Sequence, residues 1–204
     1  MVVDRARAGE ACESGQPPTR RQVPGEPGVW LLLFGDLTLF ALLFSVFLHE
    51  RREQPMLFAE SQQTLALGLG VTNTFILLTS SLLVVLANQA MRVEESRHYA
   101  SRLIVGAIAL GCCFVVLKGY EYHEKISAGI TPATNHFFMY YFVLTGLHLV
   151  HLIVGIGVLV GLWVLSRTQL ATKTRRAFFE GGACFWHLVD LLWIVIFPLL
   201  FLVR

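Results

Sequence analysis

The sequence contains few charged residues for its length. Asp, Glu, Lys and Arg make up 15% of its 204 residues, whereas about 25% is usual for a soluble domain. Hydrophobic residues make up 55%, and the mean hydropathy is +0.62. A chain of this composition has too little polar surface for a soluble globular enzyme. The net charge is only +2, which argues against the continuous basic surface of a nucleic-acid-binding protein.

Cysteine is also scarce, and its spacing excludes two common uses. The four cysteines are Cys12, the neighbours Cys112 and Cys113, and Cys184. None of them forms a CxxC or CxxCH motif, and adjacent cysteines on a helix point in different directions. The sequence therefore predicts neither a disulfide framework nor covalently attached haem.

The first 28 residues differ from the rest of the chain. They include four prolines and four arginines, and they contain no apolar segment of the kind that a signal peptide needs. This composition predicts a flexible cytoplasmic tail over residues 1–28, followed by a single membrane domain over residues 29–204.

Long apolar runs dominate the remainder. A helix rises 1.5 Å per residue, so about 20 apolar residues cross the hydrocarbon of a bilayer. Continuous hydrophobicity and mid-run glycines do not fit the alternating strands of a membrane barrel. The predicted fold is therefore an all-α bundle of five transmembrane helices. The predicted spans are Val29–Leu48, Leu65–Met91, Leu103–Tyr122, Phe137–Leu165 and Ala183–Val203.

The distribution of basic residues predicts the orientation. The tail and the second and fourth connectors together carry 11 Lys and Arg residues, whereas the opposite side carries 5. Because basic residues concentrate on the cytoplasmic side, the N-terminus is predicted to be cytoplasmic and the C-terminus outside.

Ionisable residues inside a span are costly, so they are the candidate functional residues. Asp36 lies in the inner half of the first span, and Asp190 lies at a similar depth in the last. His187 is one turn from Asp190 on the same helix face. We expect these three residues to form a functional polar cluster on the inner side. A second set, predicted to join helices through hydrogen bonds, consists of His148, His151, Glu121, Glu180 and Asn73.

The spacing of these residues leaves several interpretations open. Structural pairing between helices is one, because polar side chains often hold membrane helices together. A proton or ion path through Asp36, His187 and Asp190 is another. A metal site and a b-type haem held by two histidines are further alternatives, although the two histidine-containing helices run in opposite directions, which separates their ligands in depth. Gly157 and Gly161 form a GxxxG pair, a spacing that lets helices approach closely.

Several segments, taken in order, resemble the subunit III family of haem-copper oxidases. WHLVDLLW at residues 186–193 is similar to the family's W-H-F-V-D-x-x-W signature, and FEGGA at residues 179–183 precedes it where the family has E-x-G-A. TGLHLVH at residues 145–151 resembles T-G-F-H-G-x-H, and LKGYEY at residues 117–122 resembles Q-x-x-E-Y. Asn73 and Thr74, with Ser80 and Ser81, match the pattern of the family's second helix.

This resemblance implies an accessory subunit. A subunit III protein binds no haem or copper, performs no redox step, packs beside the catalytic subunit and holds phospholipid. It supports proton uptake or the integrity of the complex. Asp36 falls where classical subunit III has an intramembrane glutamate that reacts with carbodiimides.

Two departures from the family pattern narrow the resemblance. The chain resembles the short five-helix form, without the first two helices of the seven-helix form, so one wall of the lipid cleft is absent or comes from a partner. Asp replaces Glu at position 36, and PGEPG at residues 24–28 and FPLL at residues 197–200 resemble the accessory branch named for activating nitric oxide reductase.

The predicted function is a non-catalytic component of a cytochrome c oxidase or nitric oxide reductase. It would serve electron transport and aerobic respiration in a bacterial-type cytoplasmic (plasma) membrane, with other respiratory subunits and membrane lipids as partners. No redox centre is expected in this chain. The alternative is a self-sufficient, small proton-coupled transporter that uses Asp36 and Asp190 as a pair.

Overall fold

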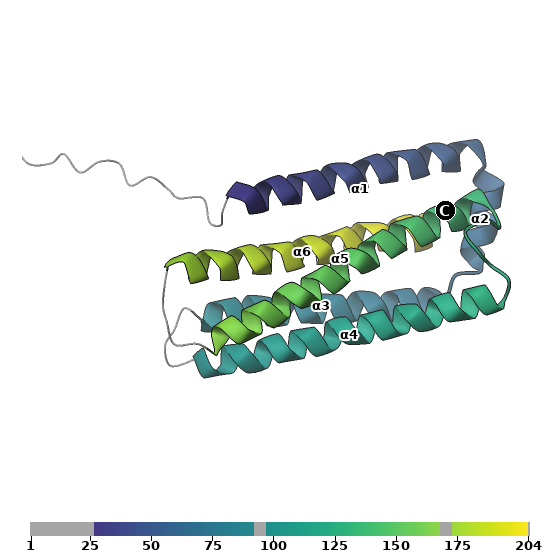
Figure 1. Ribbon diagram of the computed structural model, residues 1–204. Coiled ribbons are helices and arrows are strands. Elements are labelled where there is room, and N and C mark those ends of the chain that lie inside the picture. The colour runs from purple at the N-terminus through teal and green to yellow at the C-terminus, as the bar shows by residue number, and fades with distance from the viewer. Residues whose placement is uncertain (1–26, 92–96, 168–172, 204) are drawn as a thin grey trace, which may run out of the picture.

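The computed structural model describes residues 27–91, 97–167 and 173–203, and in these ranges every regular element is a helix (Figure 1). The predicted tail, residues 1–28, therefore lies outside the described residues except for its last two. The helices are α1 (Pro27–Glu53), α2 (Pro55–Gln63), α3 (Leu67–Ala90), α4 (Arg97–Ser127), α5 (His136–Ser166) and α6 (Lys173–Phe201).

Five of these helices, all except α2, are long and apolar enough to cross a membrane. The prediction of an all-α protein with five transmembrane helices is thus confirmed. The apolar span of α4 covers His98–Ser127, so it extends beyond the predicted Leu103–Tyr122 at both ends. Polar residues at the ends of a span can lie in the interfacial region outside the hydrocarbon. A count of apolar residues therefore underestimates the length of the helix.

The short helix α2 was absent from the sequence-based prediction. It follows α1 after a single residue and begins with Pro55, a residue that is favoured in the first helical turn because it needs no backbone N–H there. Its buried residues are Phe58 and Ser61. The connection between the first two spans is therefore a helix packed on the end of the molecule, as Figure 1 shows.

Helices α3 to α6 form a four-helix bundle in which sequence neighbours run antiparallel (Figure 1). Helices α4 and α6 each pack against both α3 and α5, so α3 and α5 lie on one diagonal of the bundle. Helix α1 lies outside this bundle, beside α5 and α6. In the most apolar 18-residue stretch of α1, 17% of the residues are buried, whereas 56% are buried in the corresponding stretch of α6.

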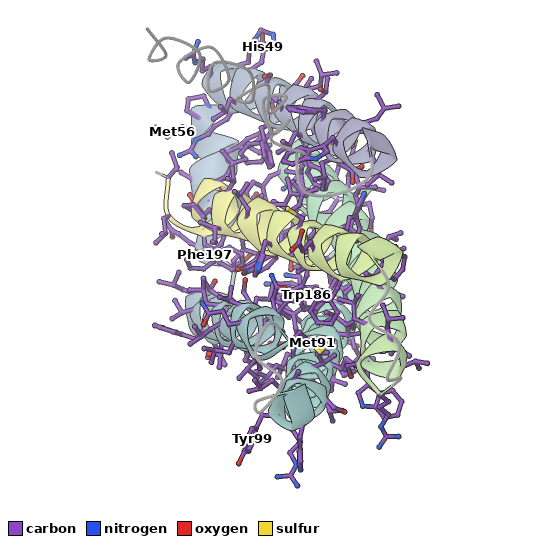
Figure 2. All side chains as sticks on the ribbon, turned by 90° about the vertical axis from the view of Figure 1, so that its left-hand side faces the viewer. His49, Met56, Met91, Tyr99, Trp186 and Phe197 are labelled. Carbon is purple, nitrogen blue, oxygen red and sulfur yellow. The ribbon has the colours of Figure 1, made fainter. Side chains whose placement is uncertain are left out.

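Large side chains fill the centre of the bundle. Trp186 of α6 is 1% exposed and lies among the helices in Figure 2. His49, Met56 and Tyr99 lie at the edge of the molecule in the same view. A Cβ atom at Gly155 of α5 would come within 2.9 Å of the Trp186 ring. Glycine at this position therefore lets α5 approach α6.

The GxxxG pair does not make this contact. Both Gly157 and Gly161 are exposed, and a Cβ at either position would meet nothing within 4 Å. The expected close approach occurs instead at Gly155 and at Gly182, where a Cβ would come within 2.9 Å of Val158. The motif gave the wrong face because its spacing alone does not say which side of α5 faces a neighbour.

Candidate functional site: polar groups at membrane depth

Asp36 of α1 pairs with His151 of α5. The distance from His151 Nε2 to Asp36 Oδ1 is 3.2 Å, and His151 Nδ1 lies 2.8 Å from the Leu147 carbonyl oxygen. A carbonyl only accepts, so Nδ1 donates its proton there. The bond between Nε2 and Asp36 then needs one proton, carried either by the imidazole or by the carboxyl group. The two side chains are 18% and 20% exposed, so this shared proton lies near the surface of the bundle.

A second contact sets the register of α1 on α5. His136 Nδ1 lies 3.6 Å from Glu50 Oε2, near the opposite end of α1 from Asp36. Between these two contacts, the Phe47 ring packs edge-on against Tyr140 with 6.0 Å between centroids. Helix α1 therefore lies antiparallel to α5, and this register brings Asp36 to the depth of His151.

His187 and Asp190 of α6 meet Ser81 of α3. The Ser81 hydroxyl lies 2.7 Å from His187 Nδ1, and it also hydrogen bonds the Asp190 side chain. One hydroxyl can donate to the carboxylate while it accepts from the imidazole N–H. Ser81 thus bridges the two residues, and Trp193 Nε1 donates to Thr74 Oγ1 at 3.0 Å in the same antiparallel register.

The three residues of the predicted inner cluster therefore have different partners. Ser81 brings His187 and Asp190 together, whereas Asp36 hydrogen bonds His151. The reason is rotational: the polar face of α6 at these positions is turned toward α3, while Asp36 is on the face of α1 that meets α5. Ser81 was part of a quoted pattern, but nothing in its position marked it as the bridge.

A buried set of polar contacts lies near the other end of the bundle, around Glu121. Lys118 Nζ is 2.9 Å from Glu121 Oε2 and 3.2 Å from the Tyr141 hydroxyl, which donates to Glu121 Oε1 at 2.5 Å. Lys118 and Glu121 are each 1% exposed. Rings surround the ammonium group, with Trp193 at 5.2 Å and Phe201 at 5.9 Å. This buried ion pair joins α4 to α5 and α6.

Lys118 was not selected as a site residue from the sequence. The signal that could have found it is the spacing of a lysine three residues before a glutamate inside an apolar run, because such residues share a helix face. Neighbouring contacts extend the same region: the Tyr122 and Thr145 hydroxyls are 2.6 Å apart, and Lys125 donates to the Thr64 carbonyl beside α2.

The other predicted helix-joining residues lie in different surroundings. Asn73 and His148 are both 0% exposed, and no described residue hydrogen bonds either side chain. The His148 ring packs against Trp193 and Phe114, with centroids 5.2 and 5.8 Å away. Glu180 is partly buried in the first half of α6.

A family model now places this arrangement among known proteins. The model described as cytochrome c oxidase subunit III matches residues 24–203, which covers all five spans and every polar contact described above. The chain belongs to the cytochrome c oxidase subunit III family.

Curated relatives of this subunit III chain come from several oxidases. It is 30% identical over 179 residues to a cytochrome c oxidase subunit 3 of Alkalihalophilus pseudofirmus, covering 86% of this chain and 84% of that one. It is 27% identical to a probable quinol oxidase subunit 3 of Staphylococcus haemolyticus, covering 86% and 87%. A cytochrome bo(3) ubiquinol oxidase subunit 3 of Buchnera aphidicola is also 27% identical, with 86% and 84% covered.

The subunit III signature on α6 supplies many of the contacts described above. Residues 186–193 contain Trp186, which fills the bundle centre, His187 and Asp190, which meet Ser81, and Trp193, which meets Thr74. Within the described ranges, no group of three His, Cys, Asp or Glu side chains lies close enough to hold a metal ion.

A shallow groove lies between α1 and α6 in this subunit III fold. Its volume is about 200 Å³. Apart from one histidine and one cysteine, its lining is apolar: Trp30, Leu33, Phe34, Leu37, Cys184, His187, Leu188 and Leu191. His187, which is hydrogen bonded to Ser81 on one side, also lines this groove.

Proposed function

We propose that this protein is the non-catalytic subunit III of a haem-copper respiratory reductase, and that it supports the stability of the complex and its proton uptake. Membership of the subunit III family over residues 24–203 carries this proposal. The partners are the catalytic haem-copper subunit, the other subunits of that complex and membrane lipids, in a bacterial cytoplasmic membrane. The redox chemistry belongs to the catalytic subunit.

Co-purification tests the assignment. The full chain is tagged at its N-terminus and extracted from native membranes in a mild detergent. The expected result is a complex whose absorbance spectrum shows haem and whose second component is a haem-copper catalytic subunit. Recovery of the chain without any haem-containing reductase would contradict the proposal.

The Asp36 and His151 pair supports the role in proton uptake. The two side chains are hydrogen bonded at membrane depth, and their partial exposure leaves them within reach of surrounding water or a partner surface. Asp36→Leu is expected to lower turnover of the assembled complex, or shorten its active lifetime, more than it lowers the amount of folded chain. The matched control is Thr38→Val, because the Thr38 hydroxyl bonds only a carbonyl of its own helix, that of Phe34, at 2.8 Å.

Two further measurements sharpen this role. A carbodiimide reacts with a protonated carboxyl group, so it is expected to modify Asp36, and the label at position 36 is expected to be lost in Asp36→Asn. Turnover and inactivation that stay unchanged in the assembled Asp36→Leu complex would remove Asp36 from the proton path.

The apolar groove between α1 and α6 supports bound phospholipid as a further part of the proposal. Its lining suits an acyl chain, and lipid analysis of the purified complex tests it. A groove variant, Leu188→Trp, is expected to reduce the amount of tightly bound phospholipid without loss of the chain from the complex.

Two versions of the proposal differ in the electron acceptor of the partner enzyme. The relatives are named as oxidase subunits, which favours an oxygen-reducing partner. The terminal segments at residues 24–28 and 197–200 favour a nitric oxide reductase, because they resemble that accessory branch. Gas consumption by the co-purified complex, measured with oxygen and with nitric oxide, decides between them.

Transport by the isolated chain is the competing function, and liposomes distinguish it. The subunit III proposal expects no proton-coupled flux from the purified chain alone. A flux that Asp36→Asn abolishes would favour the transporter. The sidedness is tested separately by thiol labelling in intact cells: Cys12 is expected to be protected, and a cysteine introduced at position 203 is expected to be labelled.

A further inference from the structure

The groove between α1 and α6 holds one polar ring among apolar side chains. Its volume is about 200 Å³, below the roughly 300–1,000 Å³ of sites that enclose a drug-sized molecule, so it takes one part of a lipid. Trp30, at the start of the apolar span of α1, lines it. Because a span begins near the membrane surface, where tryptophan is also favoured, the groove is within reach of lipid headgroups. His187 of α6 lines the same groove.

The hydrogen bonds of Ser81 determine where His187 carries its proton. The Ser81 hydroxyl lies 2.7 Å from His187 Nδ1 and also hydrogen bonds the Asp190 side chain. A carboxylate only accepts, so the hydroxyl gives its single proton to Asp190 and accepts from the imidazole. Nδ1 of His187 therefore carries a proton, which it donates to α3.

The second nitrogen of His187, Nε2, is left as an acceptor. A neutral imidazole has a single N–H, and a second proton would add a charge inside the membrane, which is costly. No described residue hydrogen bonds Nε2, and this atom is not among the buried polar atoms without a partner, which include both nitrogens of His148. Nε2 is therefore accessible, and the open space that the His187 ring lines is the groove.

An acceptor in an apolar groove selects the kind of ligand. The group that meets Nε2 has to donate a hydrogen bond. Ester carbonyls only accept, and a choline group has no N–H. An ammonium would bring a charge among the leucines of the lining, whereas a hydroxyl donates without one. The ligand that fits is a lipid with a neutral hydroxyl donor.

We infer that the groove between α1 and α6 selects a phospholipid whose headgroup carries a hydroxyl, and that this hydroxyl donates to His187 Nε2. The inference rests on the proposed binding of phospholipid in this groove. Ser81 and Asp190 are positioning residues in this site, because they hold the proton of His187 on Nδ1 and so leave Nε2 as the acceptor.

Retention of lipid by the purified complex tests this selectivity. The full chain with its accompanying subunits is placed in nanodiscs that contain equal amounts of phosphatidylglycerol and phosphatidylmethanol, two anionic lipids of which only the first has headgroup hydroxyls. Native mass spectrometry counts the lipids that stay bound after mild extraction, and the lipid that is lost in Leu188→Trp is the groove lipid. Phosphatidylglycerol is expected to exceed phosphatidylmethanol there by about fivefold, the effect of one hydrogen bond.

The outcomes separate failure of the inference from failure of the proposed function. Equal lipid counts in wild type and Leu188→Trp would remove the proposed phospholipid site, and this inference with it. Groove lipid divided equally between the two headgroups would overturn the inference alone. Phosphatidylethanolamine retained as well as phosphatidylglycerol would also overturn it, because an ammonium would then satisfy the site.

A variant without the acceptor tests the role of His187. His187→Phe keeps a ring but removes Nε2, so the groove is expected to hold lipid without preference between the two headgroups. The matched control is His49→Phe, because His49 is exposed near the opposite end of α1, where it contacts Glu53. A preference that persists in His187→Phe, or that is lost in the control, would contradict the site. Ser81→Ala is expected to weaken the preference and Ser81→Thr, which keeps the hydroxyl, to retain it. Equal losses in these two variants would contradict the positioning role of Ser81.

The position of the proton is measured independently in the wild-type complex. In protein labelled with ¹⁵N-histidine, solid-state NMR distinguishes a protonated ring nitrogen from an unprotonated one. The His187 signals are assigned by their absence in His187→Phe. The expected spectrum shows a protonated Nδ1 and an unprotonated Nε2, and a proton on Nε2 would overturn the acceptor role whatever lipid is retained.

Discussion

Helix α1 and the α3–α6 bundle use their polar residues differently. The polar contact of α1, between Asp36 and His151, joins two side chains that are about one-fifth exposed. In the bundle, Lys118 and Glu121 are 1% exposed and form bonds that link three helices. The partly exposed pair is open to its surroundings, whereas the buried pair is closed off from them.

Burial of the helices follows the same division. In the most apolar windows, 56% of α6 but only 17% of α1 is buried. Helix α1 touches the bundle along one narrow strip, and the remainder of its apolar surface is exposed. The comparison indicates that the bundle carries the stability of the chain, while α1 carries the site that other components can reach. Four substitutions test this division.

The largest expected effect comes from the buried ion pair. Glu121→Leu leaves the Lys118 ammonium buried without its carboxylate, and we expect a loss of about 3–5 kcal/mol in the free energy of unfolding. Thermal unfolding followed by circular dichroism in detergent measures it. The double variant Lys118→Met with Glu121→Leu is expected to recover most of this loss. A double variant as unstable as Glu121→Leu would show that packing and not charge is responsible.

The contact between α5 and α6 should give the next largest effect. Gly155→Val forces side-chain atoms into the Trp186 ring, and overpacking of this kind costs about 1–3 kcal/mol. Gly157→Val, two residues away, is the matched control, because a Cβ there meets nothing within 4 Å. Equal losses of thermal stability in the two variants would contradict the helix faces described above.

A smaller loss is expected between α3 and α6. Thr74→Val removes the acceptor of the Trp193 indole N–H, which costs about 1 kcal/mol. The control is Thr72→Val, because the exposed Thr72 hydroxyl bonds only the Gly68 carbonyl of its own helix at 2.9 Å. Chemical denaturation of the two variants side by side checks this, and a control that loses as much as Thr74→Val would rule out a role for the bond.

The smallest effect on stability is expected at Asp36. Asp36→Asn keeps a carboxamide that can accept from a protonated His151 Nε2 or donate to an unprotonated one, and partly exposed pairs contribute at most about 1 kcal/mol. The thermal midpoint should therefore stay near that of the wild-type chain while carbodiimide labelling at this position is lost. A destabilisation as large as that of Glu121→Leu would remove the distinction between α1 and the bundle.

Much of the architecture was predictable because membrane insertion depends on local composition. Each apolar run long enough to cross the hydrocarbon can be recognised from its own sequence, so five spans and an all-α fold followed from hydropathy alone. The helix α2 did not, because nine residues of mixed polarity carry no such signal. The motif on residues 186–193 indicated the family, but it did not indicate that Ser81 would bridge His187 and Asp190.

The amino-acid sequence by itself determined that this chain enters a membrane, how many times it crosses, and which acids and histidines lie at depth, since these depend on residues that are adjacent in the chain. Only the tertiary structure decided which of those groups meet. A pairing between helices depends on the rotation of each helix about its axis and on its antiparallel register. Packing of side chains such as Trp186 against Gly155, and Phe47 against Tyr140, sets both.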